Sequence, residues 1–156
     1  MKGKRMHTNS ENAFIYRFFF IIWLKESSHM RTPLQYHWEN RKILIVEDDD
    51  SSSFLLGEIL KRTGAELSYA STGNEAVEFI RSNPKTDLVL MDIQLPDKDG
   101  LTATREIKEI NHDISVITQS AYLNLLSIDS KEGADDFLSK PINPQLLLSK
   151  IGHFFG

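Results

Sequence analysis

The chain of 156 residues has the length of one ordinary domain with an appendage, and it can bury a core without covalent staples. It contains no cysteine, which excludes disulfides, thiolate chemistry and cysteine zinc sites and suits a reducing compartment. The net charge of −4 is unevenly spread: residues 1–40 carry six Lys/Arg and three Asp/Glu, whereas residues 41–156 carry twelve and nineteen. The acidic balance of the larger part argues against a nucleic-acid surface there.

The first forty residues lack the pattern of a folded domain. A basic start precedes an apolar run from Phe14 to Leu24, which Arg17 interrupts. This run is about half of the roughly 20 apolar residues that a membrane-spanning helix needs. No small-residue cleavage site of a signal peptide follows it. We therefore expect residues 1–40 to be an extension and linker, poorly ordered or forming a short amphipathic helix, and the domain to occupy residues 41–156.

Five short apolar runs predict the strands of one sheet. Two of them, residues 43–46 and 88–91, are continuous apolar runs, which is typical of strands buried on both faces. The predicted strands cover residues 43–46, 66–70, 88–92, 114–119 and 137–138.

A helical apolar stripe follows each of these strands. The first helix has N-cap candidates at Ser51–Ser53, and the last has Asn143 as its cap and Pro144 in its first turn. The predicted helices cover residues 54–63, 75–81, 101–110, 122–132 and 144–155, the second after a capping-box sequence at residues 72–75. Five strands that alternate with five helices predict an α/β fold with a doubly wound parallel sheet.

Polar side chains follow the predicted strands directly, where the carboxyl ends of a parallel sheet share one rim and bind ligands. These side chains are Glu47, Asp48, Asp49, Asp92, Ser120 and Lys140. Clustered carboxylates repel one another unless a cation joins them, and oxygen ligands favour Mg²⁺. Asp92, at the centre, is then a candidate nucleophile toward phosphorus, with Lys140 and Ser120 holding the remaining phosphoryl oxygens.

Each of these residues also has a simpler interpretation. Residues 47–50 could be a solvated charge run that favours the next helix through its dipole. Asp92 and Ser120 could be turn residues, and Lys140 a surface lysine before Pro141. The joint pattern, with every residue directly after a predicted strand, favours a shared site.

Four segments stand in a specific order and spacing, although each alone would be a weak signal. They are residues 43–49, 92–100, 120–122 and 137–141. With them the chain from residue 41 onward resembles the receiver domain of two-component response regulators, including the receivers of hybrid histidine kinases. This resemblance implies a flavodoxin-like (βα)5 fold in three layers, α/β/α.

The resemblance also implies a metal site and a phosphoacceptor. Asp92 matches the phosphoacceptor aspartate. Asp48 and Asp92 match direct ligands of Mg²⁺, and Glu47 matches an acid that acts through water. Gln94 matches the position whose backbone carbonyl completes the metal shell.

Three further matches concern the response to phosphorylation. Ser120 matches the hydroxyl that moves toward the phosphoryl group, with serine in place of threonine. Lys140 matches the lysine that pairs with this group, and its bond to Pro141 is expected to be cis. Phe137 matches the aromatic switch position, with phenylalanine in place of tyrosine. The fourth helix is shorter and more apolar than is usual in the family.

The implied function is a phosphorylation-controlled regulator in the cytoplasm rather than an enzyme. The phosphoryl donor would be a histidine of a sensor or hybrid kinase, or of a histidine phosphotransfer protein. A downstream protein would read the face built from the fourth helix, the fifth strand and the fifth helix. We expect a monomer or weak dimer, with no direct contact of the domain with nucleic acid or a membrane.

Three other functions are compatible with this architecture. An aspartate-based, Mg²⁺-dependent phosphohydrolase needs a second aspartate two residues after the nucleophile, where this chain has Gln94. A nucleotide- or flavin-binding module needs a glycine-rich loop after the first strand, where residues 47–50 are acidic. A receiver-like scaffold could bind partners without phosphorylation, although all of the phosphorylation residues are present.

Overall fold

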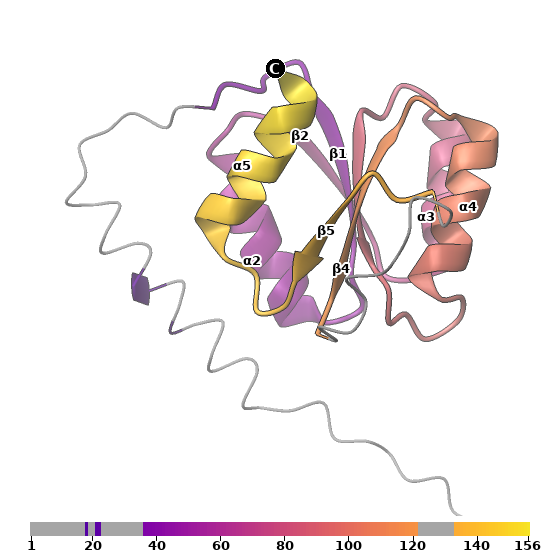
Figure 1. Ribbon diagram of the computed structural model, residues 1–156, viewed down its shortest axis with the longest axis horizontal. Helices are drawn as coiled ribbons and strands as arrows, with labels where there is room; N and C mark the ends of the chain where they lie inside the picture. The colour runs from indigo at the N-terminus through magenta and orange to yellow at the C-terminus, as the bar shows by residue number, and fades with distance from the viewer. Residues whose placement is uncertain (1–17, 19–20, 23–35, 122–132) are drawn as a thin grey trace, which may run out of the picture.

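A computed structural model describes residues 18, 21–22, 36–121 and 133–156, and within them a parallel five-stranded sheet lies between two layers of helices (Figure 1). The strand order is β2-β1-β3-β4-β5. The strands are β1 (Lys42–Val46), β2 (Glu66–Ala70), β3 (Leu88–Asp92), β4 (Ser115–Ser120) and β5 (Asp136–Ser139). The predicted doubly wound sheet is confirmed. The predicted helix at residues 122–132 and most of residues 1–40 lie outside the described residues.

Helices cover both faces of the sheet. Helices α2 (Asp50–Lys61) and α5 (Pro144–Phe155) lie on one face, and α3 (Gly73–Ser82) and α4 (Gly100–Ile110) lie on the other (Figure 1). Alternate strand residues point to opposite faces, so the two apolar cores are interleaved along each strand. In β1, for example, Ile43 and Ile45 belong to the core under α2 and α5, and Leu44 and Val46 to the core under α3 and α4.

Polar side chains cap the N-termini of these helices, close to the ends of the preceding strands. Asn143 caps α5, with Pro144 in the first turn, and both predictions are confirmed. Thr72 caps α3 through a bond from the backbone of Glu75. The expected caps of α2 at Ser51–Ser53 are wrong, because Asp49 is the N-cap and accepts from the backbone N–H of Ser52 at 2.8 Å. Asp49 still has an extended backbone directly after the strand, and its negative charge suits the helix N-terminus.

The packed part of the chain also includes residues 36–40, whose sequence has the hydrophobic period of neither a helix nor a strand. Trp38 is only 5% exposed. Its ring packs edge-on against that of Phe155, with 5.2 Å between the ring centroids. Its backbone N–H donates to the carbonyl of Thr63 at 2.8 Å. Arg41 donates to the Phe155 carbonyl at 3.0 Å and lies over the Phe155 ring. Residues before β1 therefore cover the end of the α2/α5 core.

No helix among the described residues is long and apolar enough to cross a bilayer. The residues of the apolar run at 14–24 fall mostly outside the described part.

We predict that Trp38→Ala lowers the free energy of unfolding by about 3–5 kcal/mol, because it removes a large buried ring and leaves a cavity. Urea denaturation followed by circular dichroism measures this. Phe54→Ala is the matched control, since Phe54 is 63% exposed and its loss should change stability by about 0.5 kcal/mol or less. Equal effects of the two substitutions would contradict the packing role of residues 36–40.

Candidate functional site

The strand register sets three polar side chains in one row across the sheet. Val46 pairs with Met91, so Glu47 continues β1 beside Asp92, and Asp92 in turn pairs with Gln119 of β4. The backbone N–H of Glu47 donates to Ala70 of β2, which extends the ladder to this position. All three side chains follow the alternation that points toward α2 and α5. The carboxyl edge of the sheet therefore carries two acids and an amide side by side.

Three carboxylates meet at this edge. Glu47, Asp48 and Asp92 each offer an oxygen, and these oxygens all lie within 4.8 Å of one another. Glu47 and Asp92 are buried, 4% and 3% exposed, whereas Asp48 is exposed. The set has the hard oxygen donors and the open side that a hydrated divalent cation such as Mg²⁺ requires.

The ammonium of Lys140 joins two of these acids. Its Nζ lies 2.8 Å from Glu47 Oε2 and 2.7 Å from Asp92 Oδ2. Lys140 directly follows β5, and its backbone N–H donates to the carbonyl of Ser120 at 2.8 Å. The bond to Pro141 is cis, as the resemblance implied. The predicted gathering of Glu47, Asp48, Asp92 and Lys140 is therefore found.

The cluster carries an excess of negative charge, and its pKa values are shifted accordingly. Burial raises the pKa of Glu47 to about 7, with Lys140 opposing this rise and Asp92 adding to it. Burial and the nearby Asp92 also raise the pKa of Asp48. Burial works against a charged Lys140, but Glu47 and Asp92 outweigh it and raise the lysine pKa. Three acids and one ammonium leave a formal excess of two negative charges, which a divalent cation balances.

The backbone after β3 holds the second oxygen of Asp92. The N–H of Gln94 donates to Asp92 Oδ1 at 2.9 Å, and the N–H of Gly100 donates to the Ile93 carbonyl at 2.9 Å. A Cβ at position 100 would clash with the carbonyl oxygen of Asp92, so only glycine lets α4 begin so close to the strand. The sequence showed residue 100 only as the end of a matched segment, and not this close approach. The backbone carbonyl of Gln94, the predicted metal ligand, belongs to this loop between β3 and α4.

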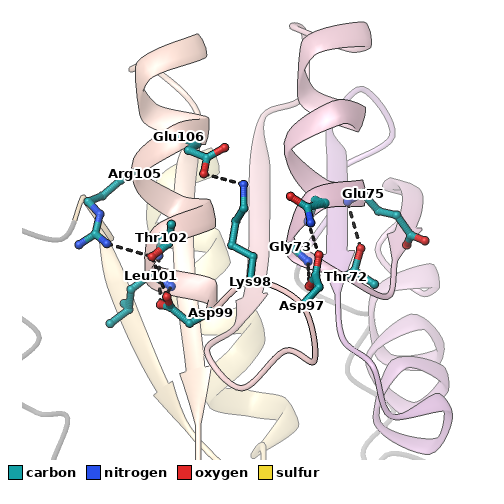
Figure 2. A network of polar contacts seen from close by, with 11 residues as sticks. Thr72, Gly73, Glu75, Asp97, Lys98, Asp99, Leu101, Thr102, Arg105 and Glu106 are labelled. Carbon is teal, nitrogen blue, oxygen red and sulfur yellow. Dashed lines mark hydrogen bonds and ion pairs between the residues drawn. The ribbon is translucent and has the colours of Figure 1, made fainter.

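Two acids that the sequence did not single out fix the loop between β3 and α4 (Figure 2). Figure 2 shows Asp97 below the N-terminus of α3, where it accepts from the backbone N–H groups of Gly73 and Asn74, each at 3.0 Å. Asp99 caps α4 through bonds from Leu101 and Thr102. Between them Lys98 pairs with Glu106 of α4 at 2.6 Å. The loop that carries Gln94 is thereby tied to both helices of the α3/α4 face.

The remaining predicted residues lie along β4 and β5. Ser120 ends β4, fully buried, and Phe137 lies in β5 beside Thr118, partly buried. Sequence reasoning missed Gln119, which precedes Ser120 on β4 and pairs with Asp92 of β3. Its Nε2 is 3.4 Å from Glu47 Oε2. A glutamine inside an apolar strand was the available signal.

We predict an acid-dependent loss of stability from Asp97. Some desolvation raises its pKa, but the N–H groups of Asn74 and Gly73 prevail and lower it to about 2, from 3.8. A lowered folded pKa means that the stabilisation is fully present above pH 3.8 and is lost as the pH falls toward 2. Asp97→Ala should therefore be less stable than wild type at pH 5, and the difference should shrink below pH 4. Urea unfolding at several pH values measures it; a pH-independent difference would contradict the charge-based role.

Comparison with known proteins agrees with this geometry. The family model described as the response regulator receiver domain matches residues 43–152. The chain belongs to this family. As a receiver domain it has relatives in larger proteins: it is 36% identical over 113 residues to a cyclic di-GMP phosphodiesterase of Thermotoga maritima, covering 71% of this chain and 30% of that protein. It is 34% identical over 124 residues to the CAI-1 autoinducer sensor kinase/phosphatase of Vibrio cholerae, covering 76% and 18%.

A solved receiver domain with this fold contains a metal ion. The receiver domain of the sensor histidine kinase PA1611 of Pseudomonas aeruginosa, solved with a magnesium ion in its active site cleft, superposes with a TM-score of 0.66. It is 30% identical, and the match covers 74% of this chain and 98% of that one. Receiver domains bind Mg²⁺ at an acidic cluster, and the cluster of Glu47, Asp48 and Asp92 fits such a site. The chain spans less than a third of the two curated relatives named above, so their whole-protein activities are not assigned to it.

Proposed function

We propose that this receiver domain accepts a phosphoryl group on Asp92 from a histidine of a sensor or hybrid kinase, or of a histidine phosphotransfer protein. The observation that carries the proposal is the Lys140 ammonium, 2.7 Å from Asp92 Oδ2 within a cluster of three carboxylates. In the transfer, an Asp92 oxygen forms a bond to phosphorus. The bond between phosphorus and the histidine nitrogen breaks, and its electron pair stays on the imidazole.

The proposed metal ligands follow from the contacts of each acid. Asp48 is the exposed member and, with Asp92, would bind the ion directly. Glu47 would act through water, because Lys140 and Gln119 contact its Oε2 and the backbone of Asp49 contacts its Oε1. The backbone carbonyl of Gln94 would complete the shell. When bound, Mg²⁺ supplies positive charge that neutralises the phosphoryl oxygens.

Lys140 and Ser120 would hold the product. A phosphoryl group on Asp92 brings roughly two negative charges to the atoms that Lys140 already contacts, so the ammonium can pair with the phosphoryl oxygens instead. Ser120 lies at the end of β4, joined to Lys140 through its carbonyl, and its hydroxyl would move toward the same group. Phe137, which pairs with Thr118 two residues before Ser120, would change its packing with this movement.

Phosphorylation would act on other proteins by changing the surface that they bind. We propose that a downstream protein reads β5, α5 and the segment at residues 122–132, which lies outside the described residues. The packed domain would begin near residue 36, supported by the burial of Trp38, with the preceding residues as an extension. We expect a monomer or weak dimer in the cytoplasm, whose reducing conditions suit a chain without cysteine.

This function is that of a phosphoacceptor and not of a phosphohydrolase. A hydrolase of this chemistry needs an acid two residues after the nucleophile, and the side chain there is the amide of Gln94. A phosphoryl group on Asp92 would therefore lack a general base at that position.

We predict that Asp92→Asn abolishes labelling by a radiolabelled phosphohistidine donor, because an amide oxygen is a much weaker nucleophile than a carboxylate. Gel autoradiography measures the label. Asp113→Asn is the matched control, since Asp113 is an exposed acid just before β4, at the opposite edge of the sheet, and its loss should leave labelling at the wild-type level. Labelling of the Asp92 variant at the wild-type rate would overturn the assignment.

We also predict that Mg²⁺ stabilises the protein and that a chelator reverses the effect. Binding to the folded state alone adds about 1.4 kcal/mol when free Mg²⁺ is about ten times its dissociation constant. Thermal unfolding with increasing Mg²⁺ should show this for wild type and Asp113→Asn, and a much smaller shift for Asp48→Asn. An equal shift in all three proteins would mean that the ion binds elsewhere.

A further inference from the structure

Gln119 is a buried polar residue whose hydrogen bonds are incomplete. It is 1% exposed, and its Nε2 lies 3.4 Å from Glu47 Oε2. Its Oε1 is also buried and has no hydrogen-bond partner among the described residues. A buried acceptor without a donor is destabilising, so the presence of an amide here requires an explanation.

On the β5 side and along its own strand, Gln119 has apolar neighbours. Its register partner on β5 is Leu138, and Ile117, two positions earlier on the same strand and face, belongs to the same apolar core. An apolar residue would pack there without the cost of an unpaired acceptor. The position therefore carries an amide at some expense of stability.

The other register partner of Gln119 is Asp92, the central acid of the site. The two terminal atoms of the amide are bonded to one carbon, so Oε1 lies next to the nitrogen that contacts Glu47. The unpaired acceptor thus belongs to the same amide that contacts the acidic cluster. A carboxylate there would repel the three acids, and an ammonium could not accept a hydrogen bond. An amide can donate to Glu47 and still accept from a second group.

We propose that Gln119 is a positioning residue of the metal site: Nε2 holds the Glu47 carboxylate, and Oε1 accepts a hydrogen bond from a water that enters with the divalent cation. The inference rests on the proposed function, since it needs a cation at the acidic cluster. Mg²⁺ keeps several of its waters when it binds to proteins, and those waters are donors. Groups that orient the metal's ligands in this way affect affinity without touching the ion.

This role complements that of Lys140. Glu47 Oε2 accepts from both Lys140 and Gln119. When the ammonium turns toward a phosphoryl group on Asp92, Glu47 loses its charged partner and keeps the neutral amide. Gln119 then holds the acid in the orientation needed to bind a metal water.

The test compares Gln119→Met, which keeps the length and removes both polar atoms, with wild type and with Thr118→Val. Thr118 is the matched control because it is also buried in β4 but lies on the other face, where its hydroxyl contacts the carbonyl of Asp136. Mg²⁺ dissociation constants are measured from backbone amide shifts in nuclear magnetic resonance titrations. Urea unfolding in a chelator measures the stability of the metal-free proteins.

We expect Gln119→Met to raise the Mg²⁺ dissociation constant roughly 10- to 100-fold and Thr118→Val to leave it unchanged. We also expect Gln119→Met to be as stable as wild type, or more stable, in the chelator, because removal of the unpaired acceptor offsets the loss of the long 3.4 Å contact from Nε2 to Glu47. A purely structural role would give the opposite result: lower stability in chelator with a wild-type dissociation constant. That result would overturn the inference.

A measurement on the wild-type protein needs no folded variant. The side-chain NH₂ signals of Gln119 should shift on addition of Mg²⁺ and saturate with the same dissociation constant as the backbone amides around Asp92. Signals that stay fixed while those amides shift would overturn the role of Gln119 and leave the metal site intact. Absence of any Mg²⁺ response in wild type would overturn the proposed metal function itself, and this inference with it.

Discussion

The interaction on which the site depends is the ammonium of Lys140 between two buried carboxylates. Glu47 and Asp92 lie side by side at the carboxyl edge of the sheet, away from bulk water, and like charges there repel strongly. Lys140 contacts one oxygen of each, at 2.8 and 2.7 Å. Removing one partner of such a buried arrangement leaves an uncompensated charge, which typically costs 3–5 kcal/mol. Lys140 therefore offsets the repulsion between the two acids through contacts to both of them.

The strand order explains why this edge holds the site. In the order β2-β1-β3-β4-β5, the chain winds outward in one direction from β1 and in the other from β3. The connections at these two strands leave on opposite faces, so their carboxyl ends border an opening, which is where ligands bind in sheets of this kind. Glu47 and Asp48 follow β1, and Asp92 ends β3. The acids thus come together because of topology, although 45 positions of the sequence separate Glu47 from Asp92.

The sequence predicted what depends on local pattern and missed what depends on contacts across the fold. Continuous apolar runs and helical stripes are local, so the five strands were predicted with bounds close to those observed. The polar residues after those strands share an edge by necessity, so Lys140 could be predicted to reach Asp92. Trp38 is different, because a single aromatic residue in a stretch without a period does not reveal that it packs on Phe155. Asp97 bonds to a helix that starts 24 residues earlier, and no local signal indicates that bond.

The loop after Asp92 and the neighbouring strands β4 and β5 are held by different kinds of contact. This difference determines which of them can respond to a change of charge at Asp92. The loop between β3 and α4 is fixed to α3 and α4 by the close approach of Gly100 to Asp92 and by the hydrogen bonds of Asp97 and Asp99. Toward β4 and β5, the contacts are made by side chains that a new charge can rearrange. Lys140 can exchange one anionic oxygen for another, and its backbone N–H is bonded to the end of β4. In the proposed function, a phosphoryl group on Asp92 would therefore act on β4 and β5 rather than on the loop that is fixed to α3 and α4.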